Sequence, residues 1–328
     1  MIDPTKITVV VCTYNRCQPL KKTIESVAAQ TLSHPLAWEI LVVDNNSTDD
    51  TRQVVEGLQR RYPERVRYAF EPEQGISYAR NTGVREARGE ILAFLDDDEI
   101  ASSGWVENLT ANLHNGEWAG AGGRVLPPSG FSPPRWLSSL SSSITGPLAV
   151  FDPALEAGQL SEPPFGANMA FRREVFDKYG GFRTDLGRTG TSMISNEDTE
   201  FGRRLMAAGL RLRYEPSALT YHPVDESRLR PSYFLSWWFN KGRSDVREFG
   251  NQPNGARLIG IPLRLFRALP WAAMRWMSAI EPPQRFAYKL EVWSCAGQIF
   301  ESYHLWLDGK RKGPERNSKS WPPAERGG

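Results

Sequence analysis

Short apolar runs alternate with amphipathic segments along the first 95 residues of the chain. The apolar runs are rich in β-branched residues and end at polar residues, a pattern typical of buried parallel strands. The segments between them place apolar residues three or four positions apart, which predicts helices. The predicted strands cover 7–14, 38–44, 65–70 and 89–95, and the predicted helices cover 19–30, 50–62 and 75–88. This alternation predicts βαβ units on a mostly parallel sheet flanked by helices, so the fold class is α/β.

The pattern is less regular after this first part. Residues 127–165 are rich in proline and serine and predict a long surface loop. Order resumes with a strand and a helix at 165–182, and with a helix at 196–210 that has Asn196 as its N-cap. A pair of strands is expected at 211–223.

The C-terminal quarter is predicted to be helical. The expected helices cover 232–250, 257–280 and 284–307. The chain is therefore divided into an α/β domain, a helical extension and a disordered tail, at residues 1–230, 231–309 and 310–328.

Composition indicates a folded protein with two differently charged parts. The chain has 328 residues, 40% of them hydrophobic and 24% charged, which excludes a disordered chain and allows a large core. Its net charge is +2, but residues 231–328 hold 15 Lys and Arg against 8 Asp and Glu, a net charge of +7 that leaves −5 for residues 1–230. The basic part also holds 7 of the 11 tryptophans. This contrast suggests catalysis in one part and attachment to a surface in the other.

Cysteine usage and hydropathy set an expectation about location. Cys12, Cys17 and Cys295 are odd in number and lack a CxxC spacing, so they support neither a disulfide framework nor a zinc site. The N-terminus lacks the features of a signal peptide, and no run of 18 apolar residues occurs. We therefore expect a cytoplasmic protein without a membrane-spanning helix.

Polar loops follow three of the predicted strands, with the sequences "TYNR", "DNNSTDD" and "DDDE". Ligands bind at the carboxyl ends of strands in such sheets, so these loops should converge on one crevice. Strand alternation would place Asp96 and Asp98 on one side, where they could share Mg²⁺ or Mn²⁺, and Asp97 on the other. The alternative is a solvated acidic turn that caps the next helix, with Glu99 as a helix-entry charge. An EF-hand is excluded because its sixth position requires glycine and is Ala101 here.

Five segments that combine these strands, loops and helices follow one another along the chain: "VVVCTYNR", "LVVDNNSTDDT", "GISYARNTGVREARGEILAFLDDDE", "GANMAFRREVF" and "NEDTEFGRRLMAAG". Together they resemble the family 2 inverting glycosyltransferases of the Rossmann-like GT-A fold, over residues 7–223. The resemblance implies that residues 1–230 bind a nucleotide sugar, expected to be UDP-linked, and a divalent cation. It also implies transfer of the sugar to a hydroxyl of a growing glycan or a lipid-linked glycan, as in polysaccharide biosynthesis.

The resemblance implies roles for single residues as well. Nucleotide-sugar binding falls on Thr13, Tyr14, Asn15, Asp44, Arg80, Asp96 and Asp97. The DXD motif makes Asp98 the main metal ligand, with help from Asp96 and, in part of the superfamily, from His222. The E-D pair at the start of helix 196–210 supplies the catalytic base, here Asp198, with Glu197 as a second candidate that could instead orient the acceptor. Asn168 is a further candidate for the acceptor pocket.

Each role has a structural alternative. Asp198 could be only a favourable charge at a helix N-terminus, Glu197 part of an ion pair, and His222 a hydrogen-bonded structural residue. Asp44 could cap the following turn, and Asn168 could form hydrogen bonds with the backbone of a turn. Two further alternatives are a surface ion pair of Arg80 with Glu73 or Glu86, and core packing for Cys12.

The chemistry of sugar transfer fits these residue types. A departing nucleotide diphosphate needs its charge neutralised, and the acceptor hydroxyl needs a general base on the opposite face of the sugar. Inversion follows from a single displacement without an enzymic nucleophile, and no G-x-S-x-G motif is present. The alternative is a non-catalytic relative that binds a nucleotide sugar or a glycan in a membrane assembly. Nucleotidyl transfer would need a G-x-G-x-R loop where "TYNR" stands, and no nucleic-acid-binding motif occurs.

The segment 257–280 combines arginines with tryptophans. Arg264, Arg267 and Arg275 fall on one side of a helical wheel, beside a broad apolar face. Such a helix suits an anionic membrane surface, which would place the protein peripherally on the inner face of the cell membrane and favour a lipid-linked acceptor. The alternative is a helix packed on the catalytic domain with its tryptophans buried. Prolines within the segment should kink or divide it.

Overall fold

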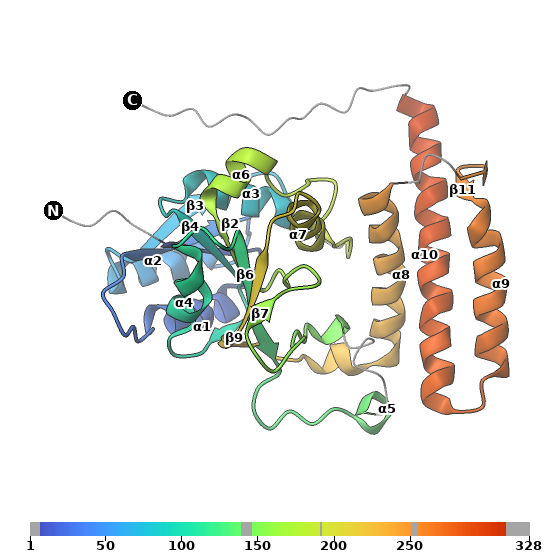
Figure 1. Ribbon diagram of the computed structural model, residues 1–328, viewed down its shortest axis with the longest axis horizontal. Helices are drawn as coiled ribbons and strands as arrows, with labels where there is room; N and C mark the ends of the chain where they lie inside the picture. Colours follow the sequence, from blue (N-terminus) through green and yellow to red (C-terminus); the bar gives the residue numbers. More distant parts are fainter. Residues whose placement is uncertain (1–6, 139–145, 191, 251–254, 313–328) are drawn as a thin grey trace.

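The computed structural model describes residues 7–138, 146–190, 192–250 and 255–312. One large sheet with its covering helices forms the main body, and three long helices stand side by side at one end of it (Figure 1). In order of distance from the sheet these helices are α8 (Pro231–Phe249), α10 (Pro282–Lys312) and α9 (Leu263–Ser278). Among the helices of the described ranges, none combines the length and the apolar composition needed to span a bilayer.

The first half of the sheet follows the prediction. Four parallel strands lie in the order β3-β2-β1-β4. They are β1 (Ile7–Thr13), β2 (Trp38–Asp44), β3 (Val66–Phe70) and β4 (Ile91–Asp96), and they are connected by α1 (Cys17–Ala28), α2 (Thr51–Arg61) and α3 (Ile76–Glu86). The α/β prediction is confirmed, and the carboxyl ends of these strands lie along one edge of the sheet.

The second half of the sheet is mixed. β8 (Asn168–Arg172) runs antiparallel to both β4 and β6 (Gly120–Leu126), and β9 (Leu212–Tyr221) runs parallel to β6. The short strands β5 (Ile100–Ala101) and β7 (Gly158–Gln159) pair with β9. The predicted pair of strands at 211–223 is wrong, because these residues form the single strand β9. Its register against β6 shifts around Pro216, which has no N–H to donate to the ladder.

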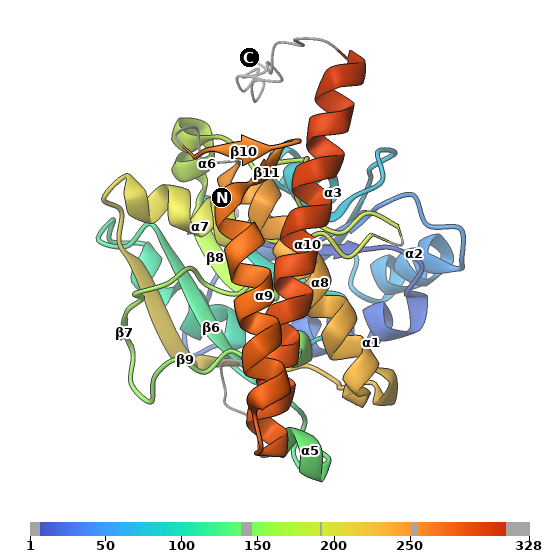
Figure 2. The ribbon, with the colours of Figure 1, turned by 90° about the vertical axis from the view of Figure 1, so that its right-hand side faces the viewer.

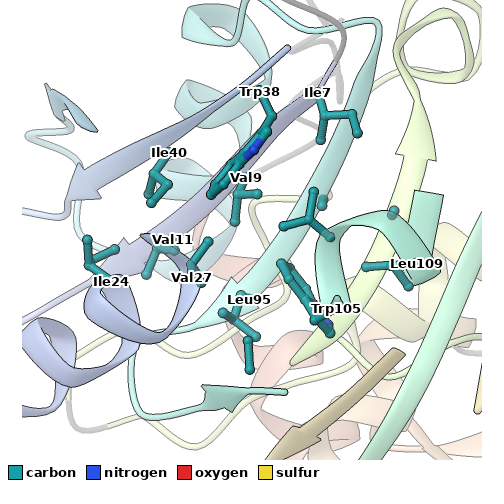
Figure 3. Close-up of a cluster of buried hydrophobic side chains, with 14 of the residues drawn as sticks. Ile7, Val9, Val11, Ile24, Val27, Trp38, Ile40, Leu95, Trp105 and Leu109 are labelled. Atoms are coloured by element: carbon teal, nitrogen blue, oxygen red, sulfur yellow. The ribbon is translucent and has the colours of Figure 1, made fainter. Parts of the chain in front are cut away.

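Helices cover both faces of the sheet, and strand alternation divides the core between them. Val9 and Val11 of β1 pack in one hydrophobic cluster with α1, α2 and α4 (Trp105–Thr110), whereas Val10 and Cys12 pack in another. The second cluster includes α3, α6 (Arg173–Tyr179) and α7 (Glu197–Ala207). Figure 3 labels side chains of the first cluster that come from β1, β2, β4, α1 and α4.

The segment 127–165 is more ordered than predicted. It contains the short helices α5 (Arg135–Ser138) and η3 (Gly146–Leu148) and the strand β7, while 139–145 lie outside the described residues. Leu137 and Leu148 are buried in a third hydrophobic cluster with Phe234 of α8 and Leu290 of α10. The prediction of a surface loop is therefore wrong for these residues, because their apolar side chains pack against the helical extension and connect it to the α/β body.

The extension needs one correction. Residues 257–262 are not helical but form a hairpin of β10 (Arg257–Leu258) and β11 (Ile261–Pro262). A proline disfavours the helical conformation of the residue before it, and α9 begins only after Pro262. The second proline, Pro270, lies inside α9 and does not divide it. α10 lies between α8 and α9 (Figure 1), and in Figure 2 α9 and α10 lie side by side in front of α8, so α9 packs on α10 rather than on the α/β body. The predicted start of the tail at residue 310 is wrong, because α10 continues to Lys312, and the rest of the tail lies outside the described residues.

Candidate active site

A cavity of about 610 Å³, a size typical of small-molecule sites, opens at the carboxyl edge of the parallel strands. Its walls come from the ends of β1 and β4, from α3, from the start of α7, and from α8 of the extension. Of the predicted site residues, those that line it are Thr13, Tyr14, Asn15, Arg80, Asp96, Asp97, Asp98, Glu197, Asp198 and His222. Asp44 and Asn168 are absent from the cavity wall.

The loops after β1 and β2 hold each other at one end of the cavity. The N–H of Asn15, which has a left-handed φ of 52°, donates to the hydroxyl of Ser47 at 3.0 Å. Asp44 is buried at the end of β2 and accepts hydrogen bonds from the N–H of Ser47 and the hydroxyl of Tyr68, both at 2.9 Å. Asp44 thus fixes the turn, as the structural alternative expected, and the next residue, Asn45, lines the cavity.

The three adjacent aspartates diverge where β4 ends. Asp96, the last residue of the strand, lies 3.4 Å from the guanidinium of Arg80. Asp97 and Asp98 lie in the following turn and share the guanidinium of Arg16, at 3.0 and 2.7 Å. The predicted alternation, with Asp96 and Asp98 together and Asp97 apart, is therefore wrong, because the extended conformation stops at Asp96. All three still line one cavity.

The two carboxylates that share Arg16 differ in their electrostatics. Burial raises the pKa of Asp97 to about 7, and Arg16 and the hydroxyl of Thr13 oppose this rise only in part. Burial also disfavours ionisation of Asp98, but the neighbouring His222 and Arg16 outweigh it and hold the pKa of Asp98 below its ordinary value. Burial lowers the pKa of His222. At neutral pH, Asp98 is a carboxylate and His222 a neutral imidazole.

Asp98 and His222 are the candidate ligands for a divalent cation, which would have to displace the guanidinium groups that contact both ligand atoms here. The Oδ2 atom of Asp98 lies 3.6 Å from Nε2 of His222, close enough for one ion to bind both, and both groups are in the protonation states that bind metals. The guanidinium of Arg228 lies 3.1 Å from the same Nε2. Within the described ranges, no three His, Cys, Asp or Glu side chains gather as a metal site. The remaining ligands would therefore come from substrate phosphates and water, as is usual for Mg²⁺.

The first turn of α7 presents two carboxylates with different surroundings. Glu197 is 7% exposed and lies 2.7 Å from Arg80, and burial together with the charge of Asp198 raises the pKa of Glu197 to about 7. Asp198 accepts hydrogen bonds from the N–H groups of Gly166 at 2.6 Å and Thr199 at 2.7 Å. A side chain at position 166 would overlap the Asp198 carboxylate, so glycine is required for this contact. These bonds fix Asp198 at the cavity wall.

Arg80 connects the two acidic groups of the cavity. It is 4% exposed, donates to Glu197 at 2.7 Å and lies 3.4 Å from Asp96. The alternative of a surface pair with Glu73 or Glu86 is therefore wrong. A buried cation that contacts both the strand end and the helix start fixes their relative position.

Two residues differ from their predicted roles. Asn168 is fully buried, accepts a hydrogen bond from the indole of Trp105 at 2.9 Å, and donates to the carbonyls of Arg124 and Ala218. Its polar atoms are occupied in bracing β8 against its neighbours, so it does not reach an acceptor in this cavity. Glu99 is not a helix-entry charge, because it is fully buried and burial raises its pKa well above the ordinary value.

Among the cavity residues that sequence reasoning missed are Arg16, Arg228, Trp237 and Lys241. Arg16 stands in the quoted loop "TYNR", and its place after a strand end was an available signal. The other three lie beyond the segments that carry the family resemblance. Trp237 and Lys241 belong to α8, so the helical extension forms part of the cavity wall.

The sheet order, the acidic turn after β4 and the carboxylates at the start of α7 together define a glycosyltransferase of the GT-A fold. The mannosyltransferase PcManGT from Pyrobaculum calidifontis, solved in complex with GDP-Man and Mn2+, has a similar fold, with a TM-score of 0.55 and 18% identity over 96% of this chain and 79% of its own. The chain belongs to glycosyltransferase family 2, since the sequence profile of "Glycosyl transferase family 2" matches residues 8–180. The resemblance seen in the sequence is confirmed.

Two curated relatives extend the similarity beyond the matched profile. The succinoglycan biosynthesis protein ExoM of Rhizobium meliloti is 30% identical over 75% of this chain and 76% of its own length. The glucosyl-dolichyl phosphate glucuronosyltransferase of Haloferax volcanii is 30% identical over 71% of this chain and 74% of its own length. The chain is therefore a glycosyltransferase enzyme.

Proposed function

We propose that the protein transfers a sugar from a nucleotide sugar, expected to be UDP-linked, to a hydroxyl of a lipid-linked glycan with inversion at the anomeric carbon. The observation that carries this proposal is the meeting of two groups in one cavity. One group is the ligand pair Asp98 and His222, and the other is the carboxylate of Asp198. A diphosphate and an acceptor hydroxyl need these groups on opposite sides of the sugar.

The donor would occupy the end of the cavity formed by the loops after β1 and β2. Thr13, Tyr14 and Asn15 line that end of the cavity and would meet the nucleoside, with Asp44 fixing the turn beside Asn45. Asp96 and Asp97 would meet the ribose, and the guanidinium groups of Arg16, Arg80 and Arg228 supply positive charge for the diphosphate.

A divalent cation, Mn²⁺ or Mg²⁺, would bind to Asp98 and His222, with Asp96 within the same cavity. When bound, it would neutralise the charge that develops on the departing diphosphate. The ionised carboxylate, the neutral imidazole and their separation of 3.6 Å support this assignment.

Asp198 would act as the general base. Its neighbour Glu197 is held by Arg80 at 2.7 Å, which leaves Glu197 better suited to orient the acceptor. Asp198 is fixed by two backbone N–H groups and lines the cavity. It would take the proton of the acceptor hydroxyl as that oxygen attacks the anomeric carbon, so a single displacement suffices.

The test is nucleotide release from a panel of UDP- and GDP-linked sugars, together with calorimetric binding of UDP. Asp198→Asn should lower kcat by about 10²–10⁴-fold and leave UDP binding intact, because only the proton acceptor is lost. Asp177→Asn, an exposed carboxylate on α6, is the matched control. Chelation of Mn²⁺ or Asp98→Asn should weaken UDP binding. Turnover retained by Asp198→Asn but lost in Glu197→Gln would move the base to Glu197, and UDP binding that ignores the metal would contradict the cation site.

The outer helix α9 supports peripheral attachment to an anionic membrane. It has three arginines and no acidic residue, and the apolar side chains of its outer side are 44–70% exposed. Those on the helix are Leu263, Phe266, Trp271, Met274 and Met277. Arg275 is occupied by Glu291 at 2.8 Å and by the rings of Trp271 and Tyr288, whereas no ion pair is found for Arg264 or Arg267 within the described residues. Exposed cations beside an apolar stripe suit anionic lipid headgroups, where a lipid-linked acceptor would reside.

A further inference from the structure

Asn196, the residue immediately before the two catalytic carboxylates, is bound by α8 of the extension. Its Nδ2 donates to Asp245 at 3.0 Å and to Glu248 at 2.6 Å, and its Oδ1 accepts from the ammonium of Lys241 at 3.0 Å. Asn196 is 3% exposed. Both polar atoms of its side chain are therefore used in contacts with one helix.

Asn196 is the N-cap residue of α7, as predicted, but its side chain does not cap the helix. An N-cap side chain accepts a hydrogen bond from an N–H of the first turn, but the side chain of Asn196 makes no such bond and turns to α8 instead. Its backbone has a left-handed φ of 79°, a conformation that asparagine tolerates better than most residues. The position thus combines an unusual backbone with a side chain bound to a different element.

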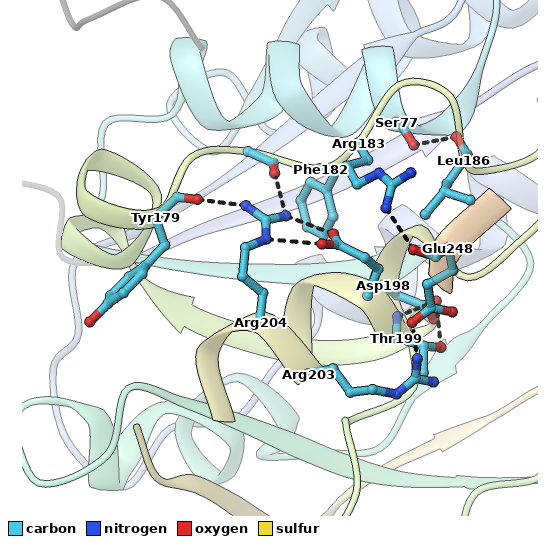
Figure 4. A network of polar contacts seen from close by, with 12 residues as sticks. Ser77, Tyr179, Phe182, Arg183, Leu186, Asp198, Thr199, Arg203, Arg204 and Glu248 are labelled. Atoms are coloured by element: carbon cyan, nitrogen blue, oxygen red, sulfur yellow. Dashed lines mark hydrogen bonds and ion pairs between the residues drawn. The ribbon is translucent and has the colours of Figure 1, made fainter. Parts of the chain in front are cut away.

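Further contacts join the same face of α8 to the segment around Asn196. The hydroxyl of Ser244 accepts from the N–H of Ser195 at 2.9 Å. Glu248 also contacts Arg203 in the middle of α7, and Figure 4 shows the two side chains turned toward each other. Because residues three, four and seven positions apart share one helix face, Lys241, Ser244, Asp245 and Glu248 form a continuous strip, which we call the α8 clamp.

Most of the contacts that hold the rest of α7 lie outside the clamp. Phe201 and Leu205 are fully buried in the second hydrophobic cluster, and Arg204 donates to the carbonyls of Tyr179 and Gly181. Loss of the clamp should therefore loosen the first turn of α7, which would keep only its contacts with Arg80 and Gly166, and leave the body of the helix in place. That first turn carries Glu197 and Asp198.

We propose that the α8 clamp acts through Asn196 to position the carboxylates of Glu197 and Asp198 for transfer. The proposal rests on the proposed function, because it takes Asp198 as the base. Asn196 and the clamp are positioning residues, since they act on the reaction through the orientation of the first turn of α7. The helical extension is then part of the catalytic machinery in addition to any role in attachment.

Two substitutions at position 196 separate the clamp from the backbone conformation. Asn196→Gly keeps the left-handed φ and removes the side-chain bonds. Asn196→Asp keeps the shape but turns a carboxylate toward Asp245 and Glu248. Each should lower kcat for nucleotide release from UDP-GlcNAc or GDP-mannose by about 10–100-fold, the effect of a displacement near 1 Å. The KM of the donor and the binding of UDP should change by less than about twofold, because the donor end of the cavity is untouched.

Arg243→Met is the matched control on α8. Arg243 bonds to Glu301 of α10 rather than to the clamp, so its loss should lower the melting temperature and leave kcat unchanged. Asn196→Gly combined with Asp245→Asn should cost little more than either change alone, because both remove the same contact. The proposal is overturned if Asn196→Gly keeps its kcat, if its kcat and KM change together, or if Arg243→Met lowers kcat to the same extent.

Amide hydrogen exchange tests the clamp independently of turnover. In the full chain, Asn196→Gly should speed exchange in peptides that cover 197–199 and leave those that cover 201–207 unchanged. Unchanged exchange at 197–199 would overturn the proposal. If the unmodified protein releases nucleotide from no donor of the panel, the proposed function fails, and this exchange measurement still decides whether α8 holds the first turn of α7.

Discussion

At the scale of single residues, the cavity wall contains two acidic side chains that are costly to ionise. Burial raises the pKa of both Asp97 and Glu197 to about 7, although each has a guanidinium partner, Arg16 and Arg80 respectively. Arg16 joins Asp97 to Asp98, and Arg80 joins Glu197 to Asp96. A diphosphate or metal that enters would change the charge that each carboxylate faces, so donor binding and proton release should be coupled here.

Stability should depend on pH through Glu197. An unfolded glutamate loses its proton near its ordinary value of 4.5, whereas Glu197 in the folded protein keeps it to about pH 7. Between these values the folded state binds more protons than the unfolded state, so stability falls as pH rises from about 4.5 to about 7. Glu197→Gln cannot titrate and should flatten this part of the curve. Melting temperatures of both proteins at a series of pH values measure the slopes, and equal slopes would contradict the assignment.

The residues that sequence reasoning found share one property. Thr13, Asp96 and Asp198 stand at the ends of predictable strands or at the start of a predictable helix, so topology alone brings them together. The relative orientation of Asp97 and Asp98 depends on the residue at which β4 stops, which periodicity does not determine. Asn168 carries the amide expected of a ligand-binding residue, but only the packing of β8 reveals that its polar atoms are already used.

At the scale of elements, the amphipathic helices were predictable, whereas contacts between distant segments were not. The alternation of apolar runs was enough to predict β1 to β4 and α1 to α3. β6 was missed because its glycine-rich sequence has little β-propensity and is shaped by close approach to β8 and β9. The contribution of α8 to the cavity depends on how it packs on η3 and α10, which no local pattern encodes.

The crossing of α8 and α10 should tolerate no side chain at Gly297. A Cβ atom there would overlap the carbonyl of Phe239, while Gly309 on the same helix has no neighbour within 4 Å of an added Cβ. Gly297→Ala should destabilise the protein by about 1–3 kcal/mol through overpacking of two backbones. Gly309→Ala should be neutral, or stabilise by about 0.5–1 kcal/mol through helix propensity. Urea denaturation of both variants measures the difference in the free energy of unfolding. Equal stabilities would show that α8 and α10 can move apart to accommodate the added methyl group.

At the scale of the whole molecule, composition and architecture divide the chain differently. The basic, tryptophan-rich part begins near residue 231. Its first helix, α8, lines the cavity, whereas α9, the helix farthest from the sheet, faces outward. Removing the extension would therefore disturb both catalysis and any surface contact. A test of membrane attachment has to use the full chain with surface substitutions on α9.

Attachment to anionic lipid predicts a defined response to charge reversal on α9. Arg264→Glu with Arg267→Glu should weaken flotation with phosphatidylserine-containing vesicles by more than about tenfold, since each basic side chain contributes about 1 kcal/mol at such a surface. The control, Arg60→Glu with Arg88→Glu, makes the same change in net charge on exposed arginines of the α/β body and should float like the unmodified protein. Binding should also weaken as salt rises.

Two substitutions in the apolar stripe distinguish lipid from a second copy of the chain as the partner of α9. If the apolar stripe serves as a dimer interface, the unmodified protein should elute as a dimer, and Trp271→Ser with Met274→Ser should convert it to a monomer without any effect of vesicles. If lipid is the partner, those two substitutions should reduce flotation and leave the elution volume unchanged, because they remove apolar surface that inserts among the headgroups. Flotation that is equal for the α9 variants and the control would exclude α9 as the attachment surface and leave the acceptor to reach the cavity by another route.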